Sequence, residues 1–246
     1  MTIKGQRVAI VTGASKGIGR AIALRLAKDG IAVVVNYASG RQAADAVVAD
    51  IELSGGKALA VQADISGPAA AADLFTAAEE RFGGADILVN NAGIIKLAPI
   101  ADMDDASFEQ QIAINLTGTF RAVREAARRL RDGGRIINFS SSVVGAYGAT
   151  YGVYAASKAA VEAITHVASK ELGPRGITVN AVAPGPVETE LFMSGKPDEL
   201  VQRIVATIPL GRLGQPDDIA SVVSFLAGPE GGWVNGQVLR ANGGMI

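Results

Sequence analysis

Three residues in the middle of the chain have types and spacing that suit acid–base chemistry. Tyr154 and Lys158 stand four residues apart, and Ser141 precedes the tyrosine by thirteen positions. Residues four apart share one face of a helix, so the lysine ammonium is expected beside the phenol. A phenol has a reference pKa of about 10, and a nearby positive charge favours its ionised form. If the serine hydroxyl held a carbonyl oxygen, this set could protonate that oxygen as a hydride reaches its carbon.

Spacing also separates these residues from similar neighbours. Tyr147 and Tyr151 lie close by, but neither is followed by a lysine four residues later. The serines at 140–142 are adjacent, and any of them could instead serve a turn. The distance to Tyr154 selects Ser141 as the candidate.

Short apolar runs alternate with longer amphipathic segments along the whole chain. The pattern predicts strands at Val8–Thr12, Ala32–Asn36, Lys57–Gln62, Ile87–Asn90, Arg135–Phe139 and Thr178–Val182. It predicts helices at Gly17–Asp29, Arg41–Leu53, Ala69–Phe82, Ala106–Leu130, Val153–Leu172 and Pro216–Leu226. Near-continuous apolar strands separated by helices indicate a parallel sheet covered on both faces. We therefore expect an α/β protein with one doubly wound, Rossmann-like domain over residues 1–246.

Composition excludes several classes of function. The 246 residues are 49% hydrophobic, enough for one large core, and the net charge of −1 gives no reason to expect nucleic acid or an anionic membrane as partner. The absence of cysteine excludes disulfides and thiolate chemistry, and no metal site is apparent from histidine and cysteine spacing. The single histidine, His166, is expected at the surface or an interface. No signal peptide or transmembrane run is recognisable, so we expect a cytoplasmic protein.

A glycine-rich turn joins the first predicted strand to the first helix. It reads Thr12-Gly13-Ala14-Ser15-Lys16-Gly17-Ile18-Gly19. The exposed N–H groups and the dipole of a helix start attract phosphate, and glycines let the backbone approach a pyrophosphate closely. The turn follows the first strand, which is the position that dinucleotide binding requires.

The Gly-x3-Gly-x-Gly spacing and the motifs after it resemble the short-chain dehydrogenases/reductases over residues 6 to 244. The matching motifs are Asn90-Asn91-Ala92-Gly93, Asn115 in a helix, Ser141 with Tyr154 and Lys158, and Pro184-Gly185. The resemblance implies hydride transfer between a nicotinamide cofactor and a carbonyl. Tyr154 would exchange the proton, Ser141 would bind the oxygen, and Lys158 would lower the pKa of the phenol and hold the nicotinamide ribose. Asn115 would anchor a water that links Lys158 to solvent.

The end of the second strand bears on cofactor choice. NAD-preferring dinucleotide folds place an Asp or Glu there, on the ribose 2′-OH. This chain has no acid in that stretch before Asp45, while Lys16, Ser39 and Arg41 could bind a 2′-phosphate. The resemblance then implies NADP(H) in preference to NAD(H). Lys16 and Arg41 could equally be solvated surface charges.

The resemblance extends the predicted cofactor site to further residues. Asp64 and Ile65 would contact the adenine, although Asp64 could also be an N-cap for the next helix. Thr189 would contact the nicotinamide carboxamide, or cap a helix. The predicted cofactor residues are Gly13, Ser15, Lys16, Gly17, Ile18, Gly19, Asn36, Tyr37, Ala38, Ser39, Arg41, Asp64, Ile65, Asn91, Ala92, Gly93, Tyr154, Lys158, Pro184, Gly185, Val187 and Thr189.

Residues 186–210 are expected to form a substrate lid, because they are rich in proline and glycine and have only a weak helical pattern. Leu191, Phe192 and Met193 give this lid an apolar wall, and Val143, Val144 and Tyr147 could line the same pocket. A substrate with an apolar body and a reactive ketone fits best. The small residues of the Tyr154 helix and the family resemblance suggest a homotetramer.

Several functions remain open at this point. The style of the sequence resembles 3-oxoacyl-acyl-carrier-protein reductases, for which Arg124, Arg128, Arg129 and Arg131 are a candidate docking patch. A sugar or polyol dehydrogenase of the same family is an alternative, and so is a non-catalytic cofactor-binding scaffold. A methyltransferase would share the glycine-rich α/β fold but would not need the Tyr154–Lys158 pair.

Overall fold

The computed structural model describes residues 5–246, which build one seven-stranded parallel sheet. The strands lie in the order β3-β2-β1-β4-β5-β6-β7, and every neighbouring pair is parallel. Their bounds are β1 Val8–Val11, β2 Ala32–Tyr37, β3 Ala58–Gln62, β4 Ala85–Asn90, β5 Leu130–Phe139, β6 Thr178–Pro184 and β7 Val238–Ala241. The order reverses between β1 and β4, and sheets of this kind bind ligands at such a switch point, outside the carboxyl ends of the strands.

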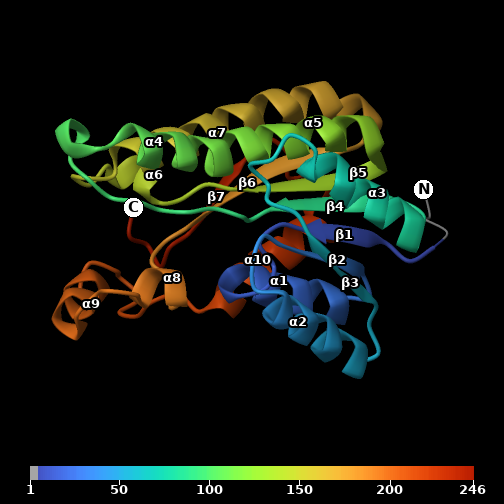
Figure 1. Ribbon diagram of the computed structural model, residues 1–246, viewed down its shortest axis with the longest axis horizontal. Helices are drawn as coiled ribbons and strands as arrows, with labels where there is room; N and C mark the ends of the chain where they lie inside the picture. Colours follow the sequence, from blue (N-terminus) through green and yellow to red (C-terminus); the bar gives the residue numbers. More distant parts are fainter. Residues whose placement is uncertain (1–4) are drawn as a thin grey trace.

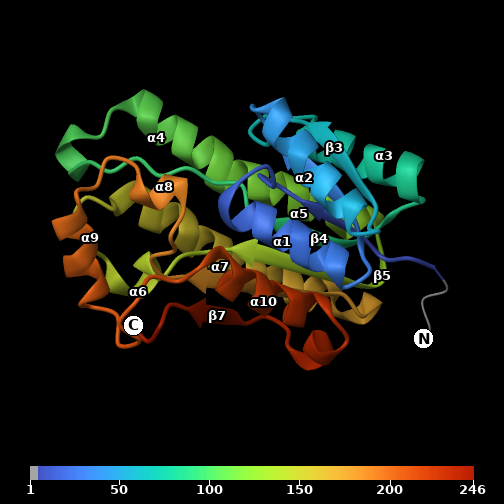
Figure 2. The ribbon, with the colours of Figure 1, turned by 90° about the horizontal axis from the view of Figure 1, so that it is seen from below.

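Helices cover both faces of the sheet (Figure 1). One layer contains α1 (Gly17–Lys28), α2 (Arg41–Leu53) and α10 (Pro216–Ala227), with α1 in contact with both others. The other layer contains α3 (Ala70–Phe82), α5 (Thr119–Arg129) and α7 (Gly152–Leu172), with α5 between its neighbours. Figure 2 shows the first layer from below, with α8 (Glu190–Met193) and α9 (Asp198–Val205) set to one side of it. The predicted doubly wound Rossmann-like fold is confirmed.

Strands β1, β2, β4 and β6 are buried along their whole length, which explains their apolar runs. Ala9 and Val11 of β1 pack into the cluster beneath α1, α2 and α10. Val8 and Ile10 of the same strand pack into the cluster beneath α3, α5 and α7. Because successive side chains in a strand point to opposite faces, one run of four residues supplies both cores.

One predicted helix divides into three parts. The segment expected at Ala106–Leu130 consists of α4 (Asp105–Gln111), a π-helical stretch η2 (Ile112–Gly118) and α5. Strand β5 starts at Leu130 rather than at Arg135, because Leu130 pairs with Ala85 across a register shift. The sheet thus extends through two glycines that sequence patterns would assign to a turn.

The segment of residues 186–210, predicted to be a substrate lid, is joined to itself by hydrogen bonds near its two ends. It contains α8 (Glu190–Met193) and α9 (Asp198–Val205). Glu188 donates its N–H to the carbonyl of Gly214 at 2.8 Å, and Gly214 donates to the carbonyl of Pro186 at 2.9 Å. The two chain ends of the lid therefore run side by side where they leave the sheet.

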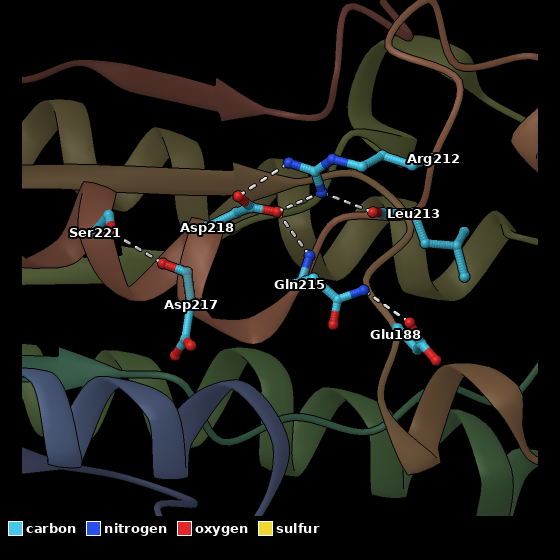
Figure 3. Close-up of polar contacts among 7 residues, drawn as sticks. All are labelled: Glu188, Arg212, Leu213, Gln215, Asp217, Asp218 and Ser221. Carbon is cyan, nitrogen blue, oxygen red and sulfur yellow. Dashed lines mark hydrogen bonds and ion pairs between the residues drawn. The ribbon is translucent and has the colours of Figure 1, made fainter.

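Side chains reinforce this base (Figure 3). Asp218 accepts from the Arg212 guanidinium at 2.6 Å and from the N–H of Gln215 at 2.7 Å. The Gln215 amide donates to Glu188 at 2.7 Å, which joins the start of α10 to the chain leaving β6.

Three short helical turns also occur, at η1 (Ile100–Asp102), η3 (Gly173–Arg175) and η4 (Glu230–Trp233), and α6 spans Val143–Ala146. Within residues 5–246, no helix combines the length and apolarity needed to cross a membrane.

Candidate active site

The acid–base residues predicted from spacing lie together at the carboxyl edge of the sheet. Ser141 follows β5, while Tyr154 and Lys158 lie one turn apart near the start of α7. The Lys158 ammonium nitrogen lies 5.8 Å from the centroid of the Tyr154 ring. The Ser141 hydroxyl is close enough to Tyr154 to lower the pKa of the phenol by hydrogen bonding.

Lys158 is buried, with 4% of its surface exposed. Its ammonium donates to the carbonyl of Phe139, the last residue of β5, at 2.8 Å. Burial lowers the pKa of Lys158 from 10.5 to about 8, because the charged form loses hydration. The ammonium is therefore still the main form at neutral pH.

Tyr154 departs from the electrostatic expectation. Burial raises the pKa of the phenol, Tyr151 raises it further, and the hydrogen bond with Ser141 opposes part of that rise. The net shift of this pKa in the cofactor-free protein is therefore upward, because loss of hydration is its largest cause. That Lys158 lowers the pKa of the phenol stays a prediction. The phenol keeps its proton at neutral pH, which is the form that protonates an alkoxide.

Asn115 lies fully buried in the π-helical stretch η2. Its side-chain amide exchanges two hydrogen bonds with the backbone of Ile94, both at 2.9 Å, and donates to Ser157 of α7 at 3.4 Å. Its backbone carbonyl accepts from the Thr119 hydroxyl at 2.9 Å. A π-bulge exposes a helix interior to such side-chain contacts and often marks a functional site. Asn115 thus connects the loop after β4 to the helix that carries Tyr154 and Lys158.

The glycine-rich turn is fastened to the segment after β4. The Asn91 amide donates to the carbonyls of Thr12 and Gly13, at 2.9 and 3.1 Å. The N–H of Ala92 donates to the Thr12 hydroxyl at 3.0 Å. Two predicted motifs from different parts of the chain therefore form one rigid unit at the β1–β4 switch point.

Two glycines in this unit leave no room for a side chain. A Cβ on Gly19 would lie 2.2 Å from the Gly13 carbonyl oxygen, and one on Gly13 would lie 3.0 Å from Ala92. A Cβ on Gly93 would sit 3.3 Å from the Asn115 amide oxygen and 3.6 Å from the Lys158 nitrogen. The turn thus packs tightly against Asn91 and Ala92, while Asn115 and Lys158 both approach Gly93.

The start of α1 fits an anionic group. Gly17 begins the helix with φ of +55°, no side chain among residues 5–246 caps it, and its first turn contains no acid. Such an end presents backbone N–H groups and a positive dipole. Ser15 and Ile18 are half-buried around it. The negative charge of a dinucleotide pyrophosphate would complement this positive helix start.

Lys16 forms an ion pair with a residue of the proposed lid. Its ammonium donates to the Glu190 carboxylate of α8 at 2.9 Å, and both side chains are exposed. The hydrogen bond from Lys16 lowers the pKa of Glu190. Sequence alone offered no partner for Lys16, because Glu190 is 174 residues away.

The predicted residues after β2 have different environments. Ala38, Ser39 and Arg41 are exposed, and Arg41 pairs with Asp45 at 3.4 Å. Asn36 is buried, with its amide oxygen accepting from the N–H of Gly13 at 3.2 Å and its nitrogen donating to the carbonyl of Ala63 at 2.9 Å. The Asn36 side chain therefore braces the glycine turn from behind.

Tyr37 and Ile65 both lie in the core. Tyr37 packs in the cluster beneath α1 and α2, while Ile65 packs in the cluster of the opposite face. Asp64 is exposed, and one of its oxygens accepts from the N–H and the hydroxyl of Ser66, at 3.0 and 2.8 Å. The alternative of an N-cap at Asp64 is wrong, since the N-cap residue of α3 is Ala69.

The segment after β6 returns to the glycine turn. Gly185 donates to the carbonyl of Ala241 at 3.0 Å and continues the chain from Pro184 of β6. Val187 is buried at the lid base. Thr189 caps α8 by accepting from the N–H of Phe192 at 3.2 Å, as the capping alternative expected. Its methyl group would lie 3.6 Å from a Cβ on Gly17, so Thr189 adjoins the start of α1.

Two side chains of this site were missed by sequence reasoning. Thr12 joins both halves of the β1–β4 unit through its hydroxyl. Gln111 is fully buried, accepts from the N–H of Lys96 at 3.0 Å, and has an amide nitrogen without a partner among residues 5–246. Its position four residues before Asn115 was the available signal, because both then face the loop after β4.

The four arginines predicted as a docking patch on one helix do not all lie on that helix. Arg128 pairs with Glu125, Arg129 with Glu79 and Arg131 with Asp86. Arg131 lies in β5 rather than on the helix, and Arg124 lies over the ring of Phe120. His166 is exposed, as expected.

Comparison with known proteins agrees with this geometry. A family model described as "Enoyl-(Acyl carrier protein) reductase" matches residues 13–246. A protein of Picea abies named "Short-chain type dehydrogenase/reductase" is 46% identical, covering 98% of this chain and 93% of its own. The chain belongs to the short-chain dehydrogenase/reductase family.

Two further members of the short-chain dehydrogenase/reductase family bear on chemistry. An Arabidopsis thaliana protein named "NADPH-dependent aldehyde reductase-like protein, chloroplastic" is 46% identical, covering 98% of this chain and 94% of its own. The crystal structure of the angucycline C-6 ketoreductase LanV with bound NADP superposes with a TM-score of 0.92. LanV is 38% identical, over 97% of this chain and 95% of its own. The protein is an oxidoreductase of this family.

Proposed function

We propose that this protein is an NADP(H)-dependent reductase that interconverts a carbonyl compound and its alcohol, with a ketone as the preferred substrate. The observation that carries the proposal is the meeting of Ser141, Tyr154 and Lys158 beside a glycine turn with an open helix start. The names of the Arabidopsis relative and of the LanV complex support the same chemistry.

In the proposed reaction, the bound nicotinamide supplies the hydride. Ser141 donates a hydrogen bond to the substrate oxygen and holds it beside the phenol. Tyr154, whose raised pKa keeps it protonated at neutral pH, gives its proton to the developing alkoxide. Lys158 holds the ribose hydroxyls, and its ammonium stabilises the phenolate that remains. In oxidation the phenolate takes the proton back.

The proposed cofactor site follows the predicted motifs. The start of α1 binds the pyrophosphate, and Asn91, Ala92 and Gly93 line the passage toward Lys158. Lys16, Ser39 and Arg41 provide donors for a 2′-phosphate, with no acid in the stretch after β2 to repel it. NADP(H) is therefore preferred over NAD(H). Thr189 and Val187 approach the nicotinamide end from the lid base.

The substrate is expected to have an apolar body. Phe192 and Met193 of the lid are half-buried, and Val143 and Val144 follow Ser141 directly. A 3-oxoacyl thioester on a carrier protein is a second candidate, for which three of the four candidate docking arginines already pair with carboxylates. A highly hydroxylated sugar would find few polar partners in this wall.

Activity assays test the proposal directly. With NADPH, wild-type enzyme is expected to reduce aryl or long-chain ketones faster than ketoses or an acetoacetyl thioester. With any one ketone, it is expected to oxidise NADPH faster than NADH. Replacing Tyr154→Phe should lower turnover by about a thousandfold or more while NADPH binding, measured by calorimetry, is retained.

Tyr151→Phe is the matched control, because its ring centroid lies only 6.5 Å from that of Tyr154. It should keep near-normal turnover. Wild-type turnover in Tyr154→Phe would overturn the mechanism, and equal affinity for NADH and NADPH would overturn the cofactor assignment.

Organisation and location complete the proposal. Residues 1–246 act as one domain with residues 186–210 as the substrate lid, and the protein works as a cytoplasmic homotetramer. The joined base of the lid supports its motion as a unit. The family resemblance supports the assembly.

A further inference from the structure

The three serines after β5 point to different partners. The Ser140 hydroxyl donates to the Glu162 carboxylate of α7 at 2.6 Å. The Ser142 hydroxyl accepts from the Asn242 amide at 3.0 Å and donates to the carbonyl of Ala183 at 3.3 Å. Both flanking serines are 3% exposed, whereas Ser141 between them is half-buried beside Tyr154. Two anchored neighbours therefore hold the one serine whose hydroxyl faces the proposed reaction.

Glu162 stands on the same face of α7 as the acid–base pair. Tyr154, Lys158 and Glu162 are spaced four residues apart, so they follow one another along the helix. Three successive residues at and after the end of β5, 139 to 141, contact these three side chains. Lys158 binds the carbonyl of residue 139, Glu162 binds the hydroxyl of residue 140, and Tyr154 meets the hydroxyl of residue 141.

The Glu162 contact, like that of the Lys158 ammonium, is a hydrogen bond with a charged partner. A hydroxyl donating to a carboxylate at this distance is charge-assisted, about twice as strong as a neutral pair. Ser140 also donates its N–H to the carbonyl of Val182 at 2.8 Å, which fixes its backbone to the sheet. Together with the Lys158–Phe139 and Asn138–Thr165 contacts, Glu162 thereby fastens the chain at the end of β5 to α7. Of these contacts, the one from Glu162 is made to the residue next to Ser141.

We propose that Glu162 is a positioning residue for carbonyl reduction, acting through Ser140 to fix where Ser141 offers its hydrogen bond. This rests on the proposed function, in which Ser141 binds the substrate oxygen. Displacing a reacting group by about 1 Å can cost up to a hundredfold in rate. Loss of one anchor, with the Ser142–Asn242 anchor still in place, should cost less.

The test compares Glu162→Ala and Ser140→Ala with wild type and repeats both in a Ser141→Ala background. Each single variant is expected to lower kcat for ketone reduction by about tenfold while the dissociation constant of NADPH stays within about twofold. In the Ser141→Ala background the same changes should lower the residual kcat by less than about twofold, because the group they position is gone. A general structural role would instead cost the same in both backgrounds.

Two further variants make the result specific. Glu162→Gln keeps an oxygen that accepts from Ser140, so it should recover kcat to within about threefold of wild type. Glu171→Ala, an exposed glutamate on the same helix, should leave kcat unchanged. If Glu162→Ala does not fold, Ser140→Ala carries the same test, since it removes the donor from the other side.

Wild-type kcat in both single variants, or an equal loss with and without Ser141, would overturn the positioning role. These outcomes are distinct from failure of the proposed function. If the proposed function were wrong, wild-type protein would reduce no ketone, or Tyr154→Phe would leave turnover unchanged. The proposed role of Glu162 would then be wrong as well.

Discussion

At the scale of single residues, burial dominates the electrostatics of the site. It raises the pKa of Tyr154 and lowers the pKa of Lys158 to about 8, so both groups are pushed toward their neutral forms. The buried ammonium has one hydrogen bond, to the carbonyl of Phe139. The buried Lys158 ammonium therefore lowers the stability of the folded protein, and the proposed reaction is what uses it. Removing this charge is predicted to raise stability and to abolish activity.

Replacing Lys158→Met should stabilise the cofactor-free protein at pH 7 while abolishing reduction. The lowered pKa corresponds to a penalty of roughly 3 kcal/mol for the buried charge, and losing the bond to Phe139 offsets about 1 kcal/mol of the gain. We expect the free energy of unfolding to rise by about 1–2 kcal/mol. Urea unfolding at equal protein concentration measures it.

The pH dependence gives this prediction a sign. Between about pH 8 and 10.5 the unfolded chain binds a proton at Lys158 that the folded protein has lost, so wild-type stability gains on the variant as pH rises. The advantage of Lys158→Met should shrink across that window. Lys170→Met, at an exposed site on the same helix, is the control and should show no such change. A gap independent of pH would contradict the account.

Residue identities were predictable where the signal was local. The spacing of Ser141, Tyr154 and Lys158 predicted a set that the structure brings together. The partners of Ser140 and Lys16 were not predictable, because Glu162 and Glu190 are brought near by the fold and not by sequence proximity. The direction of the Tyr154 pKa also required burial, which a sequence does not give.

At the scale of elements, the proposed lid is connected to the proposed cofactor site. Lys16, in the glycine turn, reaches Glu190 at the start of α8. The base of the lid is fixed by Glu188, Gln215 and Asp218 (Figure 3). A 2′-phosphate bound beside Lys16 would therefore compete with the Glu190 carboxylate for the lysine ammonium.

Replacing Glu190→Gln should tighten NADP(H) binding by about two- to fivefold, since exposed ion pairs are weak. The carboxylate otherwise occupies Lys16 and repels the phosphate. Binding of NAD(H), which lacks that phosphate, should be unchanged, and the gain should diminish at high salt. Calorimetry with both cofactors measures this.

Glu199→Gln on the exposed face of α9 is the control for Glu190→Gln and should affect neither cofactor. Equal tightening for NAD(H), or none for NADP(H), would remove Lys16 from the proposed phosphate site.

Element boundaries were predictable except where tertiary contacts override local signals. The glycines at 133 and 134 suggested that β5 begins later, yet Leu130 pairs with Ala85 and extends the strand. The long helix before it contains η2, where Asn115 binds the loop after β4. Both departures depend on partners that lie elsewhere in the chain.

At the scale of the whole molecule, two apolar surfaces remain on different sides. Phe120 of α5 and Val167 of α7 are 49% and 56% exposed, on the layer shown at the top of Figure 1. Trp233 of η4 is 98% exposed and Phe225 of α10 is 38% exposed. In the proposed tetramer, these two pairs of side chains would lie in two different kinds of contact between subunits.

Light scattering is expected to give four chains per particle for wild type. Replacing Trp233→Ser together with Phe225→Ser should leave a dimer, because one of the two contacts would be lost. Leu53→Ser, at an 87% exposed leucine of α2, is the control and should remain a tetramer. A monomeric wild-type protein would contradict the proposed assembly.

The most direct test of the central claim follows the hydride and the proton-donating tyrosine in one experiment. Wild-type enzyme is incubated with a ketone and NADPH that carries deuterium on the transferable C4 position, and the alcohol is analysed by mass spectrometry. The account predicts one deuterium on the carbinol carbon, formed with wild type and Tyr151→Phe but not with Tyr154→Phe. NADPH consumption without labelled alcohol, or equal labelling by Tyr154→Phe, would contradict it.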